Sequence, residues 1–141
     1  MEVAKLVGAI SKCIDIILTG ENIKDICHEI LTELLHITNN KMGYIAELKY
    51  SDIGSPFFRY KTVAFKSKIS SFNEYYKKHF LNDNLDFYNM NTLYGLVYKT
   101  GNTIISNDIS KDPRRGGVPK LPPDHPNINK FMGIPINYKN T

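Results

Sequence analysis

The sequence predicts an α+β fold in which an antiparallel sheet is flanked by helices. Two segments with helical spacing of apolar residues open the chain, and two segments with strand-like alternation follow them. The later helices and strands do not alternate as β-α-β units, which would be typical of a parallel sheet. A length of 141 residues fits a single domain, 1–141, with two helices in 1–37 and the sheet, with its helical and loop insertions, in 42–136.

The two opening helices follow from the spacing of apolar residues. The segment Val3–Leu18 repeats them every three or four positions, and Gly20 is expected to end this helix. The segment Ile23–Leu35 carries one continuous apolar stripe and places its charged residues on the other face. Asn22 is expected to cap this second helix, and Asp25 lies where the positive end of the helix dipole favours a carboxylate.

Strand periodicity begins after residue 41. In segment 42–50 the side chains alternate with a period of two, which predicts a half-buried strand. Segment 57–65 again has the composition of a strand. Between them, residues 51–56 supply the Asp, Gly, Ser and Pro of a short connection. Two adjacent strands with a short connection predict an antiparallel hairpin.

Two further helices are expected in the second half of the chain. Ser71 and Glu74 form a capping-box pattern before a short aromatic helix at 72–80, and 82–89 reads as irregular. A helix at 92–99 is expected to start at a capping Asn91 and to end at Gly101, with a buried face made of Leu93, Leu96 and Val97.

The last expected elements are two short strands separated by a long loop. Residues 103–106 predict the first strand and 131–136 the second, where Pro135 argues for an edge position or a bulge. The loop 107–130 holds five prolines and two adjacent glycines.

Composition and charge narrow the class of protein. The hydrophobic and charged fractions, 42% and 23%, lie near globular averages. The net charge of +4 arises from lysines scattered along the chain, whereas a nucleic-acid-binding protein concentrates its positive charge on one face. No apolar run is long enough to span a bilayer, and Lys12 and Asp15 interrupt the short apolar stretch at the N-terminus. We therefore expect a cytoplasmic protein that binds neither nucleic acid nor membrane.

No enzyme signature is present in the sequence. Dinucleotide, phosphate-loop, zinc-protease and serine-hydrolase motifs are absent. Cys27 and His28 are neighbours on a helix, about 100° apart, and cannot form a nucleophile–base pair. Cys13 and Cys27 have the apolar neighbours of small buried side chains, not of a disulfide or a metal pair. The sequence predicts no catalytic activity and no metal site.

The loop 107–130 is the segment in which polar groups converge, and three interpretations compete there. A metal site would use Asp108, Asp112, Asp124 and His125, but nearby positive charges disfavour it. An anion site would use Arg114 or Arg115 as a bidentate donor, with His125 nearby. In the structural interpretation, which we favour, Asp108 and Asp112 pair with the arginines or form local turn hydrogen bonds, and so tie the loop to the sheet.

Aromatic residues allow two interpretations as well. They could line a pocket for a planar ligand, or they could form the core beneath the helices, which is the more usual role. The residues concerned are Tyr75, Tyr76, Phe80, Phe87, Tyr88 and Tyr94.

The segment Thr92–Ile136 contains a series of short motifs in a fixed order: Thr100-Gly101, Asn107-Asp108, Asp112 to Pro119, His125-Pro126 and Phe131 to Ile136. In this order of motifs the segment resembles the GAF family of signalling domains. Upstream, the resemblance rests on the order of helices and strands and on the aromatic region. It implies an antiparallel sheet flanked by helices, as in GAF and PAS domains, with a pocket under the helix-and-loop region and a role in sensing or signal relay.

Family ligands include cyclic nucleotides, haem and bilins, while the members with the most similar loop often occur in kinases and cyclases with no assigned ligand. A covalently bound bilin is not expected, because both cysteines lie in the opening helices. No cofactor is assigned. The candidate ligand-binding residues are Tyr94, Asn107, Asp108, Arg114, Arg115, His125 and Phe131.

From the resemblance we expect this chain to be without the last strand and the closing helix that follow the segment corresponding to residues 131–136 in the family. In the family that strand is central, so both halves of the sheet are expected to present open edges. We therefore expect a non-catalytic sensory or regulatory module that binds a small ligand or a protein partner. The partner could be a second copy bound through the N-terminal helices or an open sheet edge. The alternatives are a fragment of a larger signalling enzyme, such as a histidine kinase or nucleotide cyclase, and a remnant domain without a ligand.

Overall fold

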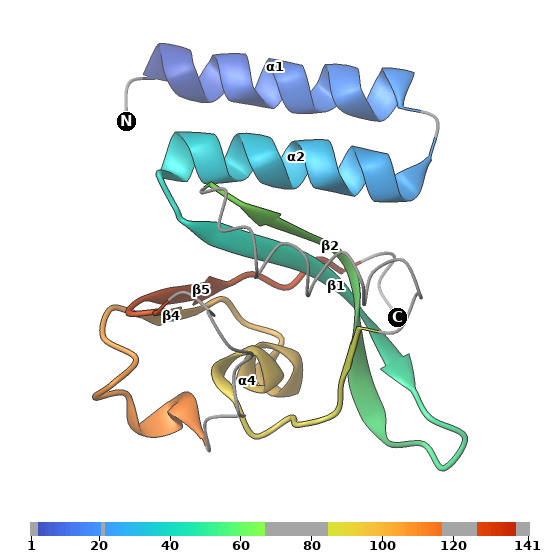
Figure 1. Cartoon of the computed structure of the whole chain (residues 1–141), viewed down its shortest axis with the longest axis vertical. Coiled ribbons are helices and arrows are strands. Elements are labelled where there is room, and N and C mark those ends of the chain that lie inside the picture. The colour runs from blue at the N-terminus through green and yellow to red at the C-terminus, as the bar shows by residue number, and fades with distance from the viewer. Residues whose placement is uncertain (1–2, 21, 67–84, 117–126, 138–141) are drawn as a thin grey trace. The chain divides into compact units, whose positions relative to one another are not determined.

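The fold is mixed α and β with antiparallel sheets, as the sequence predicts. The computed structural model describes residues 3–20, 22–66, 85–116 and 127–137 (Figure 1). These residues hold three α-helices and five strands in two sheets, whereas one sheet was expected. The chain divides into two compact units, Met1–Lys49 with Phe58–Asp86 and Tyr50–Phe57 with Phe87–Thr141, and each is described by itself.

Helices α1 (Val3–Thr19) and α2 (Ile23–Thr38) pack against each other in the first unit (Figure 1). The prediction for the start of α2 is confirmed, because the Asn22 side chain accepts a hydrogen bond from the Asp25 backbone N–H at 3.0 Å. The helix runs three residues beyond the predicted Leu35. Asn39 ends it in the left-handed conformation, with φ of 54°.

Strands β1 (Met42–Tyr50) and β2 (Pro56–Phe65) form the predicted hairpin. Its two ends are closed by backbone hydrogen bonds from Ser51 to Ser55, 2.9 Å, and from Lys66 to Lys41, 2.8 Å. A third strand, β3 (Asp86–Phe87), pairs with β2 so that the order is β1-β2-β3. This strand lies in the segment 82–89, which was expected to be irregular. It was not predicted because two residues are too few to show the alternation of a strand.

The core of the first unit lies between α2 and the hairpin. Leu31 and Leu35 of α2 pack on Ala64 of β2, and Ile45 of β1 joins them. Gly43 makes this approach close, since a Cβ on it would lie 2.9 Å from a Leu31 methyl carbon. The burial of β1 does not alternate as expected: Met42 to Lys49 are all half-buried.

The second unit contains α4 (Leu93–Thr100), β4 (Ile104–Ser106) and β5 (Phe131–Gly133). Strands β4 and β5 are antiparallel, with Ile105 opposite Met132. The expected cap of α4 is wrong by one residue. Thr92, not Asn91, accepts a hydrogen bond from the Gly95 N–H, at 3.1 Å. The end of α4 at Gly101 is confirmed, with φ of 64°.

Other expectations differ in detail or lie outside the described residues. Strand β5 ends at Gly133, two residues before Pro135, instead of continuing to Ile136. On α4, Leu93 is buried as expected, whereas Leu96 and Val97 are half-buried. The expected helix at 72–80 lies outside the residues that the structure describes. None of the helices described is long and apolar enough to cross a membrane.

Candidate functional site

The loop after β4 is more regular than its sequence suggests. A short 3-10 helix, η1 (Pro113–Arg115), interrupts it, and Asp112 caps this turn. The Asp112 carboxylate accepts a hydrogen bond from the Arg114 backbone N–H at 2.9 Å, and Pro113 supplies a backbone angle suited to the first turn. The Asp-Pro-Arg sequence therefore folds locally into a turn that points the Arg114 side chain back at Asp112.

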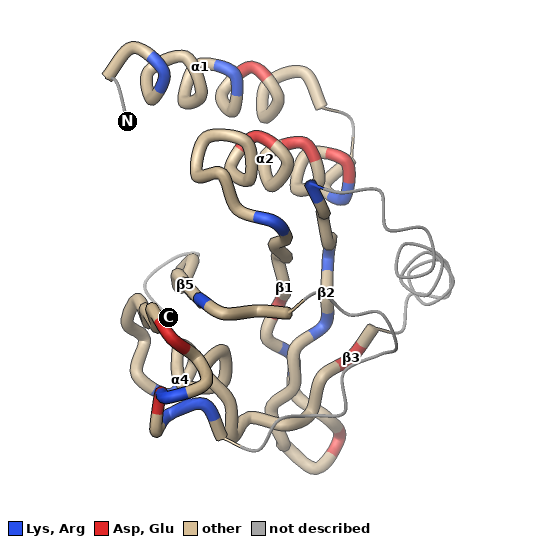
Figure 2. Tube along the Cα trace, turned by 60° about the vertical axis from the view of Figure 1, so that its left-hand side comes forward, with Lys and Arg blue, Asp and Glu red and all other residues tan. Residues whose placement is uncertain are grey.

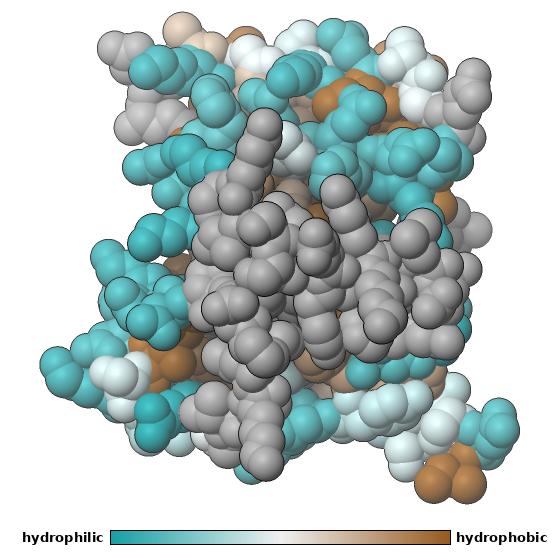
Figure 3. Space-filling model, viewed as in Figure 1, coloured by the Kyte–Doolittle hydropathy of each residue, from teal (hydrophilic) through white to brown (hydrophobic). Residues whose placement is uncertain are grey.

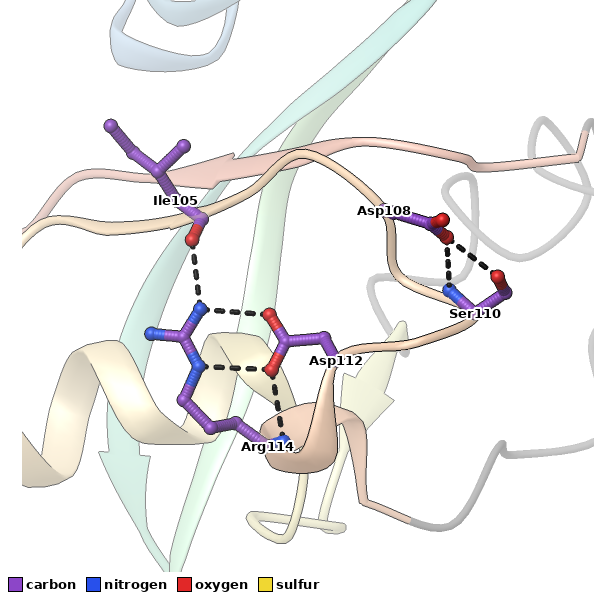
Figure 4. Close-up of polar contacts among 5 residues, drawn as sticks. All are labelled: Ile105, Asp108, Ser110, Asp112 and Arg114. Atoms are coloured by element: carbon purple, nitrogen blue, oxygen red, sulfur yellow. Dashed lines mark hydrogen bonds and ion pairs between the residues drawn. The ribbon is translucent and has the colours of Figure 1, made fainter.

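Asp112 and Arg114 form a bidentate pair that also binds strand β4 (Figure 4). The Arg114 Nε donates to Asp112 Oδ1 at 2.9 Å, and Nη2 donates to Oδ2 at 2.7 Å. The same Nη2 donates to the Ile105 backbone carbonyl at 2.9 Å. We call Ile105, Asp112 and Arg114 the clasp, because their contacts fasten the loop to β4.

Electrostatics keep the clasp charged. The Arg114 guanidinium, its backbone N–H and the Ser106 hydroxyl hold the pKa of Asp112 well below its usual range. Hydrogen bonding to Asp112 in turn raises the pKa of Arg114. The Asp112 side chain is only 7% exposed. The carboxylate is thus occupied by Arg114, and the guanidinium offers no free bidentate fork to a ligand.

Asp108 is the second acid of the loop, and it does not pair with an arginine as expected. Its Oδ1 accepts from the Ser110 backbone N–H at 3.1 Å and from the Ser110 hydroxyl at 2.5 Å (Figure 4). Its other oxygen lies 3.1 Å from Lys111 Nζ. These contacts hold the pKa of Asp108 below its usual value. Asp108 thus forms local turn hydrogen bonds, which the structural interpretation gave as the alternative to pairing with an arginine.

A depression of about 300 Å³ lies beside the clasp, against the first turn of α4. Gly116, one of its lining residues, approaches the start of α4 closely: it forms a bridge with Thr92, and a Cβ on it would lie 1.7 Å from the Asn91 carbonyl oxygen. Its volume is at the low end for small-molecule sites. The residues that line it are Met90, Asn91, Thr92, Leu96, Lys99, Pro113, Arg114 and Gly116.

The candidate ligand-binding residues do not gather around this depression. Among those that the structure describes, only Arg114 lines it. Asn107 and Arg115 are exposed, Phe131 is half-buried in β5, and His125 lies outside the described residues. Tyr94 contacts Phe87 edge-on at a centroid distance of 6.5 Å, and burial raises the pKa of its hydroxyl.

Of the aromatic residues singled out in the sequence, Phe87, Tyr88 and Tyr94 are described, and Tyr75, Tyr76 and Phe80 are not. Tyr88 stacks on Phe57 at a centroid distance of 5.0 Å. Phe87 and Tyr94 are half-buried and Tyr88 is 62% exposed, so these rings contact one another without forming the buried core that the core interpretation expects.

Sequence reasoning missed three participants in this region. Lys99 lines the depression, the Ile105 carbonyl completes the clasp, and the Ser106 hydroxyl lies beside Asp112. Lys99 lies in the last turn of α4, where a basic residue is common in any helix and so does not single out a site. The other two depend on how β4 lies against η1, so no local pattern indicates them.

Charged and metal-ligating groups elsewhere in the described chain form no second centre. Figure 2 shows Lys and Arg spread over α1, α2 and the hairpin. In the part of the chain that the structure describes, no three His, Cys, Asp or Glu residues are grouped as metal ligands would be. Burial raises the pKa of the Cys27 thiol, which disfavours the reactive thiolate.

Comparisons of the chain with family models, with curated proteins and with solved structures gave no match.

Proposed function

We propose that this chain is a non-catalytic, GAF-like regulatory module that acts in signal transduction by binding another protein chain. The observation that carries the proposal is the apolar surface of α1. Val3, Val7, Ile10, Ile14 and Ile17 lie on one side of this helix and are each 50–76% exposed. Single exposed apolar residues are ordinary, but a contiguous apolar stripe is typical of an interaction site.

The contacts of the clasp favour a binding role for a surface other than the loop 107–130. Its carboxylate and its guanidinium are bound to each other and to Ile105. Such groups hold a loop in place, whereas a catalytic or anion-binding group must present a free donor or acceptor to its substrate. The apolar helix therefore supports the proposed function better than the loop does.

The assignment to a GAF-like module rests on the resemblance of Thr92–Ile136. In this proposal the Asp112–Arg114 pair gives the Asp-Pro-Arg-Arg motif a structural task, namely to hold the loop on β4. A regulatory domain of this kind passes its signal through contact with another chain, which agrees with the exposed face of α1.

Site-specific photo-crosslinking tests the protein-binding proposal. A benzophenone amino acid is placed at position 10 or 14 of α1 and, as a control, at position 53, where Ile53 in the β1–β2 turn is 89% exposed. We expect a defined adduct from the α1 positions alone, with its partner identified by peptide sequencing. The purified partner should then bind the wild-type chain but not an Ile10→Asp, Ile14→Asp variant. Equal labelling from all three positions would sink the proposal.

Binding of a small anionic ligand is the second candidate function. The observation that favours it is the depression beside α4, which combines apolar Met90 and Leu96 with the Lys99 ammonium group. Thermal unfolding with cyclic nucleotides, haem and biliverdin tests it. A ligand that binds there should raise the melting temperature of the wild-type chain and of a Lys130→Ala control, but not that of a Lys99→Ala variant. No shift with any of these ligands would remove this candidate.

Two alternatives place the same chain in other settings. It could be part of a larger signalling enzyme, such as a histidine kinase or nucleotide cyclase, or a remnant domain without a ligand. A parent gene whose reading frame continues beyond Thr141 into such an enzyme would favour the first. A chain that yields neither a crosslinked partner nor a ligand-induced shift would favour the second.

A further inference from the structure

We propose that the partner of α1 is the same helix in a second copy of this chain. The inference rests on the proposed protein-binding function and names its partner. The surface concerned, the α1 stripe, consists of Val3, Val7, Ile10, Ile14 and Ile17, with Leu6 and Leu18 at its margins.

The spacing of the α1 stripe suits a partner helix. Its five central residues follow one another at intervals of four, three, four and three positions, which is the a and d pattern of a coiled coil. Each central residue is β-branched, so its side chain has little rotamer freedom to lose on packing. A continuous seam of this kind fits another helix better than it fits an extended peptide, whose side chains alternate with a period of two.

A different side of α1 makes its contacts within the chain. Ala9 and Ile16, about a third of a turn from the centre of the stripe, are buried, with 4% and 8% exposed. Lys12 forms an ion pair with Glu33 of α2. Helix α1 can therefore stay packed on α2 and still present the stripe. Two copies that meet through their stripes would form a four-helix arrangement, which is a common way to cover such surfaces.

The charges on α1 favour a second copy over other partners. The residues that flank the a and d positions are Ala4, Leu6, Ser11, Cys13 and Leu18, and none of them is charged. Identical copies therefore meet without like-charge repulsion. A dedicated different helix would usually be selected by charged flanking residues. A membrane surface would usually be matched by several Lys and Arg on the polar face, whereas α1 has Lys5 and the paired Lys12 (Figure 2).

The area of the stripe is sufficient for a dimer. Its seven side chains are between 38% and 77% exposed. With about 100 Å² for one fully exposed aliphatic side chain, the stripe offers about 400 Å² of apolar surface. Two copies would bury about 800 Å² of it, and because about 60% of an interface is apolar, the total is about 1,300 Å². Specific interfaces begin at about this size.

The face of the molecule in Figure 3 shows hydrophobic patches between hydrophilic residues in the region of α1 and α2. The seven residues of the stripe are identified by their exposed fractions.

Light scattering on the full chain during size-exclusion chromatography tests the inference. The chain mass is 16.1 kDa, so we expect twice this mass for the wild type between about 5 and 200 µM. Ile10→Glu combined with Ile14→Glu should weaken the dimer by at least about tenfold and return the single-chain mass. Both positions are half exposed in the single chain, so the helix should remain folded, which far-UV circular dichroism verifies.

Controls separate this inference from the function it rests on. Ile53→Glu, at a position that is 89% exposed in the β1–β2 turn, should leave the dimer intact. Should the double Glu variant unfold, Ile14→Ser removes the seam contact without a charge and should still weaken the dimer. A wild-type chain that is monomeric at about 200 µM, or a dimer that survives a folded double variant, overturns the inference. If such a monomer still binds a different crosslinked protein through α1, the proposed function stands and only the second copy is ruled out.

Discussion

Gly116, which lies next to the short helix η1, is a position where substitution is expected to be costly. Its φ of 65° and ψ of −172° lie in a region that only glycine occupies readily, and placing Ala there costs about 1–3 kcal/mol. An Ala Cβ would also lie 1.7 Å from the Asn91 carbonyl oxygen, a backbone atom that cannot rotate away. The bridge to Thr92 must then open, at about 1 kcal/mol for each hydrogen bond lost. We expect Gly116→Ala to lower the free energy of unfolding by about 3 kcal/mol.

Gly101→Ala is the matched control for this substitution. Gly101 also has a positive φ, 64°, but a Cβ added to it would meet open space within 4 Å, so only the left-handed conformation is penalised. That penalty is about 1 kcal/mol. The two substitutions should therefore differ by about 2 kcal/mol, and the difference measures the close approach of Gly116 to Asn91.

Urea unfolding followed by far-UV circular dichroism measures both variants, and tyrosine fluorescence provides a second probe because the chain has nine Tyr and no Trp. At about 3–4 °C for each kcal/mol, melting temperatures should fall by about 10 °C for Gly116→Ala and about 4 °C for Gly101→Ala. Equal losses, within about 0.5 kcal/mol, would refute the reasoning, because Gly116 would then show no cost beyond its backbone angles.

Three further outcomes are expected. Leu31, which is 6% exposed, lies in the core between α2 and the hairpin. Leu31→Ala should lower the free energy of unfolding, measured in urea, by about 2–5 kcal/mol. A loss below about 1 kcal/mol would mean that this cluster is not a packed core. The pKa of Asp112 is lower in the folded chain than in the unfolded one, so its charge stabilises the fold above about pH 4 and this contribution is lost as the pH falls further. The stability difference between wild type and Asp112→Asn should therefore shrink from pH 7 to pH 3, and a constant difference would contradict the clasp. Burial raises the pKa of Cys27, so iodoacetamide should label this thiol more slowly in the folded chain than in urea at pH 8.5, as followed by mass spectrometry, and equal rates would show that the thiol is not shielded.

Sequence reasoning succeeded where the determining contacts are local. The start of α2 follows from Asn22 and Asp25, which are three residues apart and bind each other directly. The Asp112–Arg114 pair likewise joins residues two apart, so a turn can be anticipated from the letters alone. Helix and strand periods predicted α1, α2 and the hairpin for the same reason.

Sequence reasoning failed where a contact with a distant segment decides which of two neighbouring residues takes a structural role. Asn91 and Thr92 are both good helix caps, and the choice of Thr92 goes with its bridge to Gly116, which no local pattern reveals. The division of the strands into two sheets is also a property of long-range pairing. The Ile105 carbonyl belongs to the clasp only because β4 lies beside η1.

The bond from Arg114 to Ile105 has a consequence for aggregation. Strand β4 pairs with β5 on one side, and no other described strand pairs with it. A strand edge with free carbonyl groups is a template on which another molecule can add a strand. Because the Ile105 carbonyl accepts a hydrogen bond from the charged Arg114 guanidinium, this acceptor is already occupied when another strand approaches. We therefore expect the clasp to disfavour strand addition at β4, as charged residues beside a strand edge do in general.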